Sequence, residues 1–159
     1  MKPLAVLLMG SPADAEHAGV IEEALHLFGI ETEFRIASAH RTPEHTLAIL
    51  KHYESTGRPL IYITIAGRSN ALSGFTDPQV GAPVIACPPP DKDEDIWSSL
   101  RMPPGVGPAV ILEPVNAALF AAKVFAQYDP AIAIAVASFQ KAQRQRVLDA
   151  DAKRQTGEK

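Results

Sequence analysis

Residues 38–43 read Ser-Ala-His-Arg-Thr-Pro and stand between an apolar, strand-like run and a helix-like one. The planar guanidinium of Arg41 is suited to a phosphate or a carboxylate, and Ser38 can donate a hydrogen bond to the same group. His40 stands between them, and an imidazole with a pKa near neutrality is a natural general acid–base. Since a lone histidine at a strand end is often structural, these residues alone leave catalytic, binding and structural roles open for His40.

A second candidate lies near the N-terminus, where residues 9–14 read Met-Gly-Ser-Pro-Ala-Asp. A glycine at a strand end followed by Ser11 at a helix start predicts an anion cradle, because backbone N–H groups and the helix dipole point outward there. Asp14 can accept hydrogen bonds from sugar hydroxyls. The alternative is that Ser11 or Asp14 only caps the helix, and the phosphate-binding patterns GxxxxGK[ST] and GxGxxG are both absent.

A third candidate, residues 66–74, reads Ala-Gly-Arg-Ser-Asn-Ala-Leu-Ser-Gly between apolar runs. Gly67, Arg68, Ser69 and Asn70 put flexibility, a guanidinium, a hydroxyl and an amide into one turn, which favours a binding loop over a capped helix start. No metal site is expected, because HExxH, a Cys/His cluster and an Asp-x-Asp loop are missing. The GxSxG motif of a serine hydrolase is also missing.

Five apolar runs of strand length are nearly continuous, as in strands buried on both faces; they are residues 3–9, 33–37, 60–66, 83–87 and 109–113. Helix-like stretches lie between them, at residues 14–28, 43–56 and 114–127, and another begins at residue 130. This alternation predicts an α/β fold with a doubly wound parallel sheet and a flavodoxin-like strand order, 2-1-3-4-5. Ligands bind beyond the carboxyl ends of such strands, where the three candidate segments lie.

The bulk properties restrict the class of protein. A chain of 159 residues suits one domain, expected to span residues 1–154 with a frayed tail at 155–159. The net charge of −3 and the lack of a basic stripe argue against a nucleic-acid partner. No apolar run approaches the roughly 20 residues of a transmembrane helix, and the run Leu4–Met9 is too short for a signal peptide. With Cys87 as its one cysteine, expected to be a small buried residue, the chain is predicted to be cytoplasmic.

The three candidate segments and the later motifs PVIACPPP, DIWSSLRMPPGVGPAVILEPVNAALFAAKVFA together resemble the PurE family of purine biosynthesis, from about residue 4 to about residue 150. Several long motifs in the same order make the resemblance specific. It implies a three-layer α/β/α sandwich that forms homo-oligomers, commonly octamers. Such assembly would explain why the last two helices are so apolar.

The resemblance favours one branch of the family. The mutase branch has a loop like AGGAAHLPG, whose histidine falls here at Ala71, whereas GRSN, CPPP and DIWSSLRMP resemble the carboxylases of 5-aminoimidazole ribonucleotide (AIR). Those enzymes join CO2, as a substrate, to C4 of AIR without ATP, biotin or metal. Arg41 departs from this pattern, because carboxylases often have lysine there and mutases arginine. The alternative is therefore a mutase that moves the carboxylate from the exocyclic nitrogen to C4.

The resemblance also implies a role for each candidate residue. His40 is expected to be the catalytic acid–base. The remaining residues are expected to bind the ribonucleotide and CO2. Ser11, Ser38 and Arg41 are expected to bind the 5′-phosphate, and Asp14 the ribose hydroxyls. The base and the incoming carboxylate are expected to be bound by Gly67, Arg68, Ser69 and Asn70. The proline-rich stretch after Cys87 is expected to complete the pocket. The other histidines, at positions 17, 26, 45 and 52, are interpreted as surface or packing residues.

Overall fold

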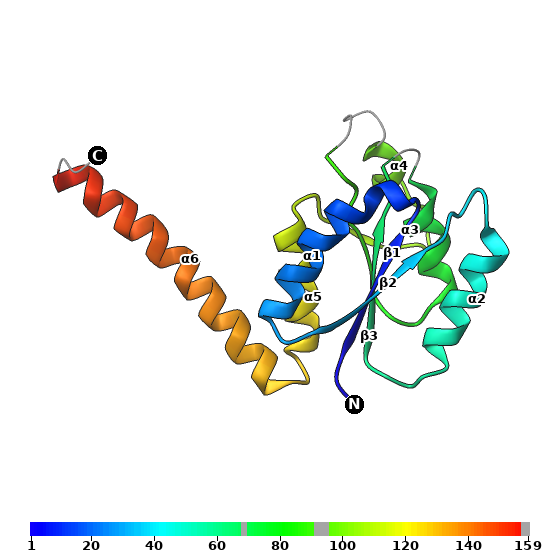
Figure 1. Ribbon diagram of the computed structural model, residues 1–159, viewed down its shortest axis with the longest axis horizontal. Helices are drawn as coiled ribbons and strands as arrows, with labels where there is room; N and C mark the ends of the chain where they lie inside the picture. The colour runs from blue at the N-terminus through cyan, green and yellow to red at the C-terminus, as the bar shows by residue number, and fades with distance from the viewer. Residues whose placement is uncertain (68–69, 91–95, 157–159) are drawn as a thin grey trace.

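The structure, a computed structural model, describes residues 1–67, 70–90 and 96–156 (Figure 1). Its centre is a five-stranded sheet in which every neighbouring pair is parallel, with the order β2-β1-β3-β4-β5. The strands are β1 (Leu4–Met9), β2 (Glu31–Ile36), β3 (Leu60–Ile65), β4 (Val84–Ala86) and β5 (Ala109–Val110). The predicted doubly wound sheet and its strand order are confirmed.

Helices cover both faces of this sheet (Figure 1). The helical elements are η1 (Pro12–Asp14), α1 (Ala15–Leu27), α2 (Pro43–Glu54), α3 (Ala71–Thr76), η2 (Asp77–Gln79), α4 (Trp97–Leu100), α5 (Pro114–Phe125) and α6 (Pro130–Thr156). One buried cluster joins the sheet to α1, α5 and the start of α6. A second cluster joins the opposite face to α2 and α3, which completes the predicted three-layer α/β/α sandwich.

The central strands are buried on both faces, as their continuous apolar sequences predict. Successive side chains of a strand point to opposite faces, so Leu7 of β1 packs with α1 and α5 while Leu8 packs with α2. In β2 the prediction of burial on both faces is wrong, because this strand lies at the sheet edge and Ile36 is 47% exposed. An apolar run therefore identified the strand but not its position in the sheet.

The register of the strands brings their carboxyl ends to one level. Met9 is paired with Ile36 on one side and with Ile65 on the other. The residues that follow these three strands consequently leave the sheet at the same edge. On α1, Ala18 and Ile21 are buried against the sheet and fix the helix there.

The last helix, α6, packs only at its start and then extends away from the body of the protein (Figure 1). Phe139 packs edge-to-face on Phe28, with 5.3 Å between ring centroids. Ile134 is 68% exposed and Val147 is 70% exposed. These apolar side chains support assembly of several copies, which stays a prediction. The helix runs to Thr156, past the expected boundary at residue 154, and residues 157–159 lie outside the described residues.

Among the described residues, no helix combines the length and the apolar character that crossing a membrane would require.

Candidate active site

Gly10 is the point where the first candidate segment (residues 9–14) meets the third (residues 66–74). Its N–H donates to the Ile65 carbonyl at 2.8 Å, and the N–H of Ala37, beside the second segment (residues 38–43), donates to the Met9 carbonyl at 2.8 Å. A Cβ atom on Gly10 would lie 3.3 Å from the Ala66 Cβ. The absence of a side chain at Gly10 thus lets the first and third segments approach closely.

Arg41 joins the second segment to the same point. Its Nη2 donates to the Gly10 carbonyl at 3.1 Å. Within the segment, the Arg41 N–H donates to the Ser38 Oγ at 3.3 Å, and the Ser38 N–H donates to the Thr42 Oγ1 at 2.9 Å. Thr42 occupies the N-cap position of α2, although its hydroxyl closes this turn instead of capping the helix. The three candidate segments therefore meet at the carboxyl ends of β1, β2 and β3.

His40 lies in this closed turn and is exposed. Its ring makes no hydrogen bond to any residue within 1–67, 70–90 or 96–156. An imidazole held on a fixed turn, with both ring nitrogens open to a ligand, is suited to proton transfer. The interpretation of His40 as a packing residue is not supported, and its catalytic role stays a prediction.

Ser11 and Asp14 form a reciprocal capping box on η1. The Ser11 N–H donates to Asp14 Oδ2 at 2.9 Å, and the Ala13 N–H donates to Ser11 Oγ at 3.3 Å. Burial raises the pKa of the Asp14 carboxyl above its ordinary value, against the opposing effects of the Ser11 N–H and of His17. The capping alternative is thus realised, and ligand binding by these two residues stays a prediction.

The third segment lies beside the proline-rich stretch that follows Cys87. A Cβ atom on Gly67 would lie 3.9 Å from the Pro89 ring, which is ordinary contact distance. The predicted residues Arg68 and Ser69 lie outside the described residues. Gly67 and the prolines are therefore neighbours, as the predicted pocket wall requires.

Asn70, at the start of α3, is buried and is bonded to α4. Its N–H donates to Ser98 Oγ at 3.1 Å, and its side-chain Nδ2 donates to Ser99 Oγ at 2.8 Å. Sequence analysis gave Ser98 and Ser99 no role, because they are distant in sequence and follow no motif of known chemistry.

His17, interpreted from the sequence as a surface or packing residue, packs against Cys87. It is half-buried in the first turn of α1, with Nε2 3.5 Å from the Cys87 Sγ. Burial lowers the pKa of the His17 imidazole, whereas Cys87 and the charges of Asp14 and Glu113 act in the opposite direction. Burial also raises the pKa of the Cys87 thiol to about 12, so the thiol is neutral at physiological pH and a poor nucleophile. Cys87 is the small buried residue that was predicted.

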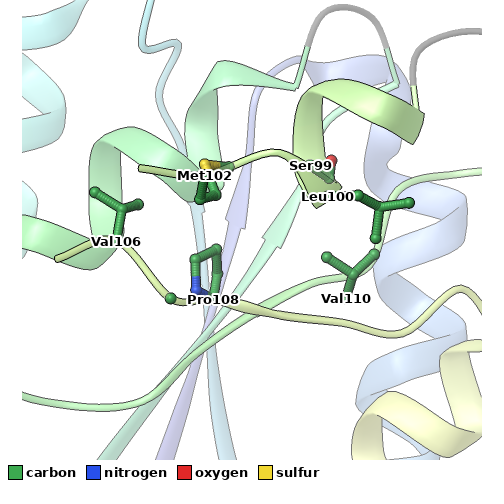
Figure 2. A pocket seen from close by; sticks show the side chains of 7 residues that line it. Ser99, Leu100, Met102, Val106, Pro108 and Val110 are labelled. Atoms are coloured by element: carbon green, nitrogen blue, oxygen red, sulfur yellow. The ribbon is translucent and has the colours of Figure 1, made fainter. Parts of the chain in front are cut away.

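A separate hollow of about 410 Å³ lies beside α4 (Figure 2). It is lined by Ser99, Leu100, Met102, Val106, Gly107, Pro108 and Val110. None of the predicted site residues lines it, so the candidate site is placed by the meeting of the three segments. Among the residues that the structure describes, no group of three His, Cys, Asp or Glu side chains could hold a metal ion.

The raised pKa of Asp14 allows a test of how its carboxyl affects the free energy of unfolding. A carboxyl whose pKa rises on folding binds more protons in the folded state, so stability increases as the pH falls through that pKa. We predict that Asp14→Asn, which keeps an oxygen for the Ser11 N–H, increases the free energy of unfolding at pH 7 and weakens its pH dependence. Urea unfolding between about pH 4 and about pH 7 measures both.

The control is Asp149→Asn, which changes an exposed carboxylate on α6 and should alter the free energy of unfolding by less than about 0.5 kcal/mol. A clear decrease in stability for Asp14→Asn at pH 7 would show that the carboxylate itself stabilises the fold.

Comparisons with known proteins agree with this architecture. The family model described as AIR carboxylase matches residues 4–146. A phosphoribosylaminoimidazole carboxylase of Treponema denticola is 53% identical over 96% of this chain and 98% of its own, and one of Archaeoglobus fulgidus is 48% identical over 92% and 82%. The crystal structure of Treponema denticola PurE superposes with a TM-score of 0.94 at 52% identity, covering 96% of this chain and 98% of that one. This chain belongs to the AIR carboxylase family.

Proposed function

We propose that this chain is an AIR carboxylase, a carboxy-lyase of purine biosynthesis that joins CO2 to C4 of AIR and forms 4-carboxy-5-aminoimidazole ribonucleotide. The observation that carries the proposal is the 3.1 Å hydrogen bond from Arg41 to the Gly10 carbonyl. It brings the turn that bears His40 to the edge where the first and third segments meet. Relatives named for this activity cover almost the whole chain and support the same reaction.

The groups at this edge match the parts of a ribonucleotide. Arg41 uses one N–H on Gly10, and the other donors of its guanidinium can bind the 5′-phosphate together with the Ser11 and Ser38 hydroxyls. Asp14, in the first turn of the following helix, accepts hydrogen bonds from the ribose hydroxyls. A ligand bound in this way would present its base to His40 and to the third segment.

The chemistry needs one positioned acid–base. C4 of AIR is electron-rich because the exocyclic amine donates into the ring, so C4 attacks CO2 and one C=O electron pair moves onto oxygen as the carboxylate forms. The adduct carries both hydrogen and carboxylate on a tetrahedral C4. His40 takes that hydrogen as a proton, and the C–H electron pair restores the aromatic ring. No ATP, biotin or metal takes part in these steps.

The direct test is a steady-state assay of the purified chain with AIR and bicarbonate, in the presence of a chelator and without ATP. We expect product formation with a rate that increases with CO2. The mutase alternative, which Arg41 favours, would require the carbamate on the exocyclic nitrogen of AIR as substrate. Product from the carbamate but not from bicarbonate would identify a mutase, and product from neither would refute both reactions.

For the acid–base assignment we predict that His40→Asn lowers the rate of carboxylation by about 10²–10⁴-fold, because the titrating group is lost. The dissociation constant for AIR should change by less than about threefold, since phosphate and ribose contacts lie on other residues. His52→Asn, an exposed histidine near the end of α2, is the matched control and should keep its activity. A His40→Asn enzyme with near-normal turnover would assign the proton transfer to another group.

For phosphate binding we predict that Arg41→Ala weakens AIR binding by roughly 10–100-fold, because a charge-assisted hydrogen bond to phosphate is lost. The matched control is Arg58→Ala. Arg58 lies at the amino ends of the strands, away from the candidate site, where it bonds to Glu31 and the Lys2 carbonyl. Isothermal titration at two salt concentrations measures both variants. Unchanged affinity in Arg41→Ala would place the phosphate elsewhere.

A further inference from the structure

Two hydrogen bonds from one buried residue connect the third segment to α4. The Asn70 N–H donates to Ser98 Oγ at 3.1 Å, and the Asn70 Nδ2 donates to Ser99 Oγ at 2.8 Å. Asn70 is 3% exposed and Ser99 is 2% exposed. We propose that Asn70, Ser98 and Ser99 form a clamp that fixes the start of α3 beyond the carboxyl end of β3, so that Asn70 assists carboxylation through α4 and not by contact with substrate. The inference rests on the proposed function.

The local geometry ties both donors of Asn70, its N–H and its Nδ2, to α4, while its buried Oδ1 has no hydrogen-bond partner among the described residues. It occupies the N-cap position of α3, where an asparagine side chain ordinarily accepts a hydrogen bond from its own helix. Here the side chain makes no such capping bond and is directed to Ser99 of a different element. Burying an amide group costs free energy unless it is hydrogen-bonded, and removing one group of a buried hydrogen-bonded pair leaves the other group unsatisfied. The pair Asn70–Ser99 is therefore specific for this arrangement of α3 and α4.

A second contact holds the same two elements together. A Cβ atom on Gly74 would lie 3.0 Å from the Met102 Cε, so Met102, which follows α4, packs tightly against α3 where Gly74 has no side chain. Met102 and Ser99 also line the hollow beside α4 (Figure 2). The start of α3 is thus fixed by polar contacts at Asn70, and the helix is fixed again at Gly74 by an apolar one.

Ala66 and Asn70 are fixed independently of each other. Ala66 lies against Gly10 and is set by the close approach of β1 and β3. Asn70 is set by α4. The phosphate-binding residues proposed above lie on the first and second segments and make no described contact with Ser98 or Ser99. Loss of the clamp should consequently reduce turnover much more than nucleotide affinity.

The test uses the full chain and single hydroxyl changes. Ser98→Ala removes the acceptor of the Asn70 N–H, and because Ser98 is exposed the substitution should not prevent folding. We expect hydrogen exchange of the Asn70 amide to increase by about 3–10-fold, and kcat for carboxylation to decrease by a similar factor, with the dissociation constant for AIR within about twofold of wild type. Ser98→Thr keeps a hydroxyl and should restore both values.

Two further variants separate a positioning role from the alternatives. Ser73→Ala is the matched control, because Ser73 is also buried on α3 but its Oγ has no hydrogen-bond partner among the described residues. It should leave amide exchange at Asn70 and kcat unchanged. Asn70→Ala should lower kcat no more than the double variant Ser98→Ala/Ser99→Ala, since the three residues act as one unit.

Several outcomes would overturn the inference. Unchanged Asn70 exchange in Ser98→Ala would show that the clamp does not hold the segment, and faster exchange with normal kcat would reduce it to a structural contact. A loss in Asn70→Ala far beyond that of the double variant would indicate direct contact of Asn70 with substrate. If wild type itself does not carboxylate AIR, the proposed function is wrong, while the exchange measurements still decide whether the clamp exists.

Discussion

The close approach of β1 and β3 at Gly10 is the constraint on which the candidate site depends. The Gly10 N–H bonds to the Ile65 carbonyl, its Cα faces Ala66 with little space, and its carbonyl accepts from Arg41. A single backbone position thus contacts all three sheet-edge segments. Because parallel strands need a crossover between them, segments that are distant in sequence can share one edge only if their strands end at the same level. Met9 is paired with Ile36 of β2 and with Ile65 of β3, so the three strands end at the same level.

Burial raises the pKa of both Asp14 and Cys87, but it has different consequences for the two residues. Asp14 holds the Ser11 N–H, yet burial raises its pKa, so its charged form is disfavoured by the surroundings that position it. Cys87 shows the opposite case, because burial keeps its thiol neutral and the residue behaves as part of the core.

Much of the fold and part of the site could be predicted from the sequence. Continuous apolar runs identified β1 and β3, and the rule that ligands bind beyond the carboxyl ends of strands placed His40 and Arg41 correctly at the shared edge. The exposure of β2 could not be predicted, because an edge position is decided by the whole topology and not by local pattern. The bonds from Asn70 to Ser98 and Ser99 depend on how α4 packs on α3, and a separation of nearly thirty residues carries no periodic signal.

The neighbouring residues His40 and Arg41 show how one turn can combine a fixed backbone with an exposed side chain. Arg41 is tied to Gly10, and its own N–H is tied to Ser38, so the backbone on either side of the imidazole has a defined position. His40 itself is exposed, and its ring makes no hydrogen bond to the described residues. A backbone that is already fixed has little freedom left to lose when a ligand binds, so only the side-chain torsions of the exposed imidazole remain to be ordered. If a protein group bonded the ring instead, that ring nitrogen would be occupied and could not take part in the proton transfer proposed for His40.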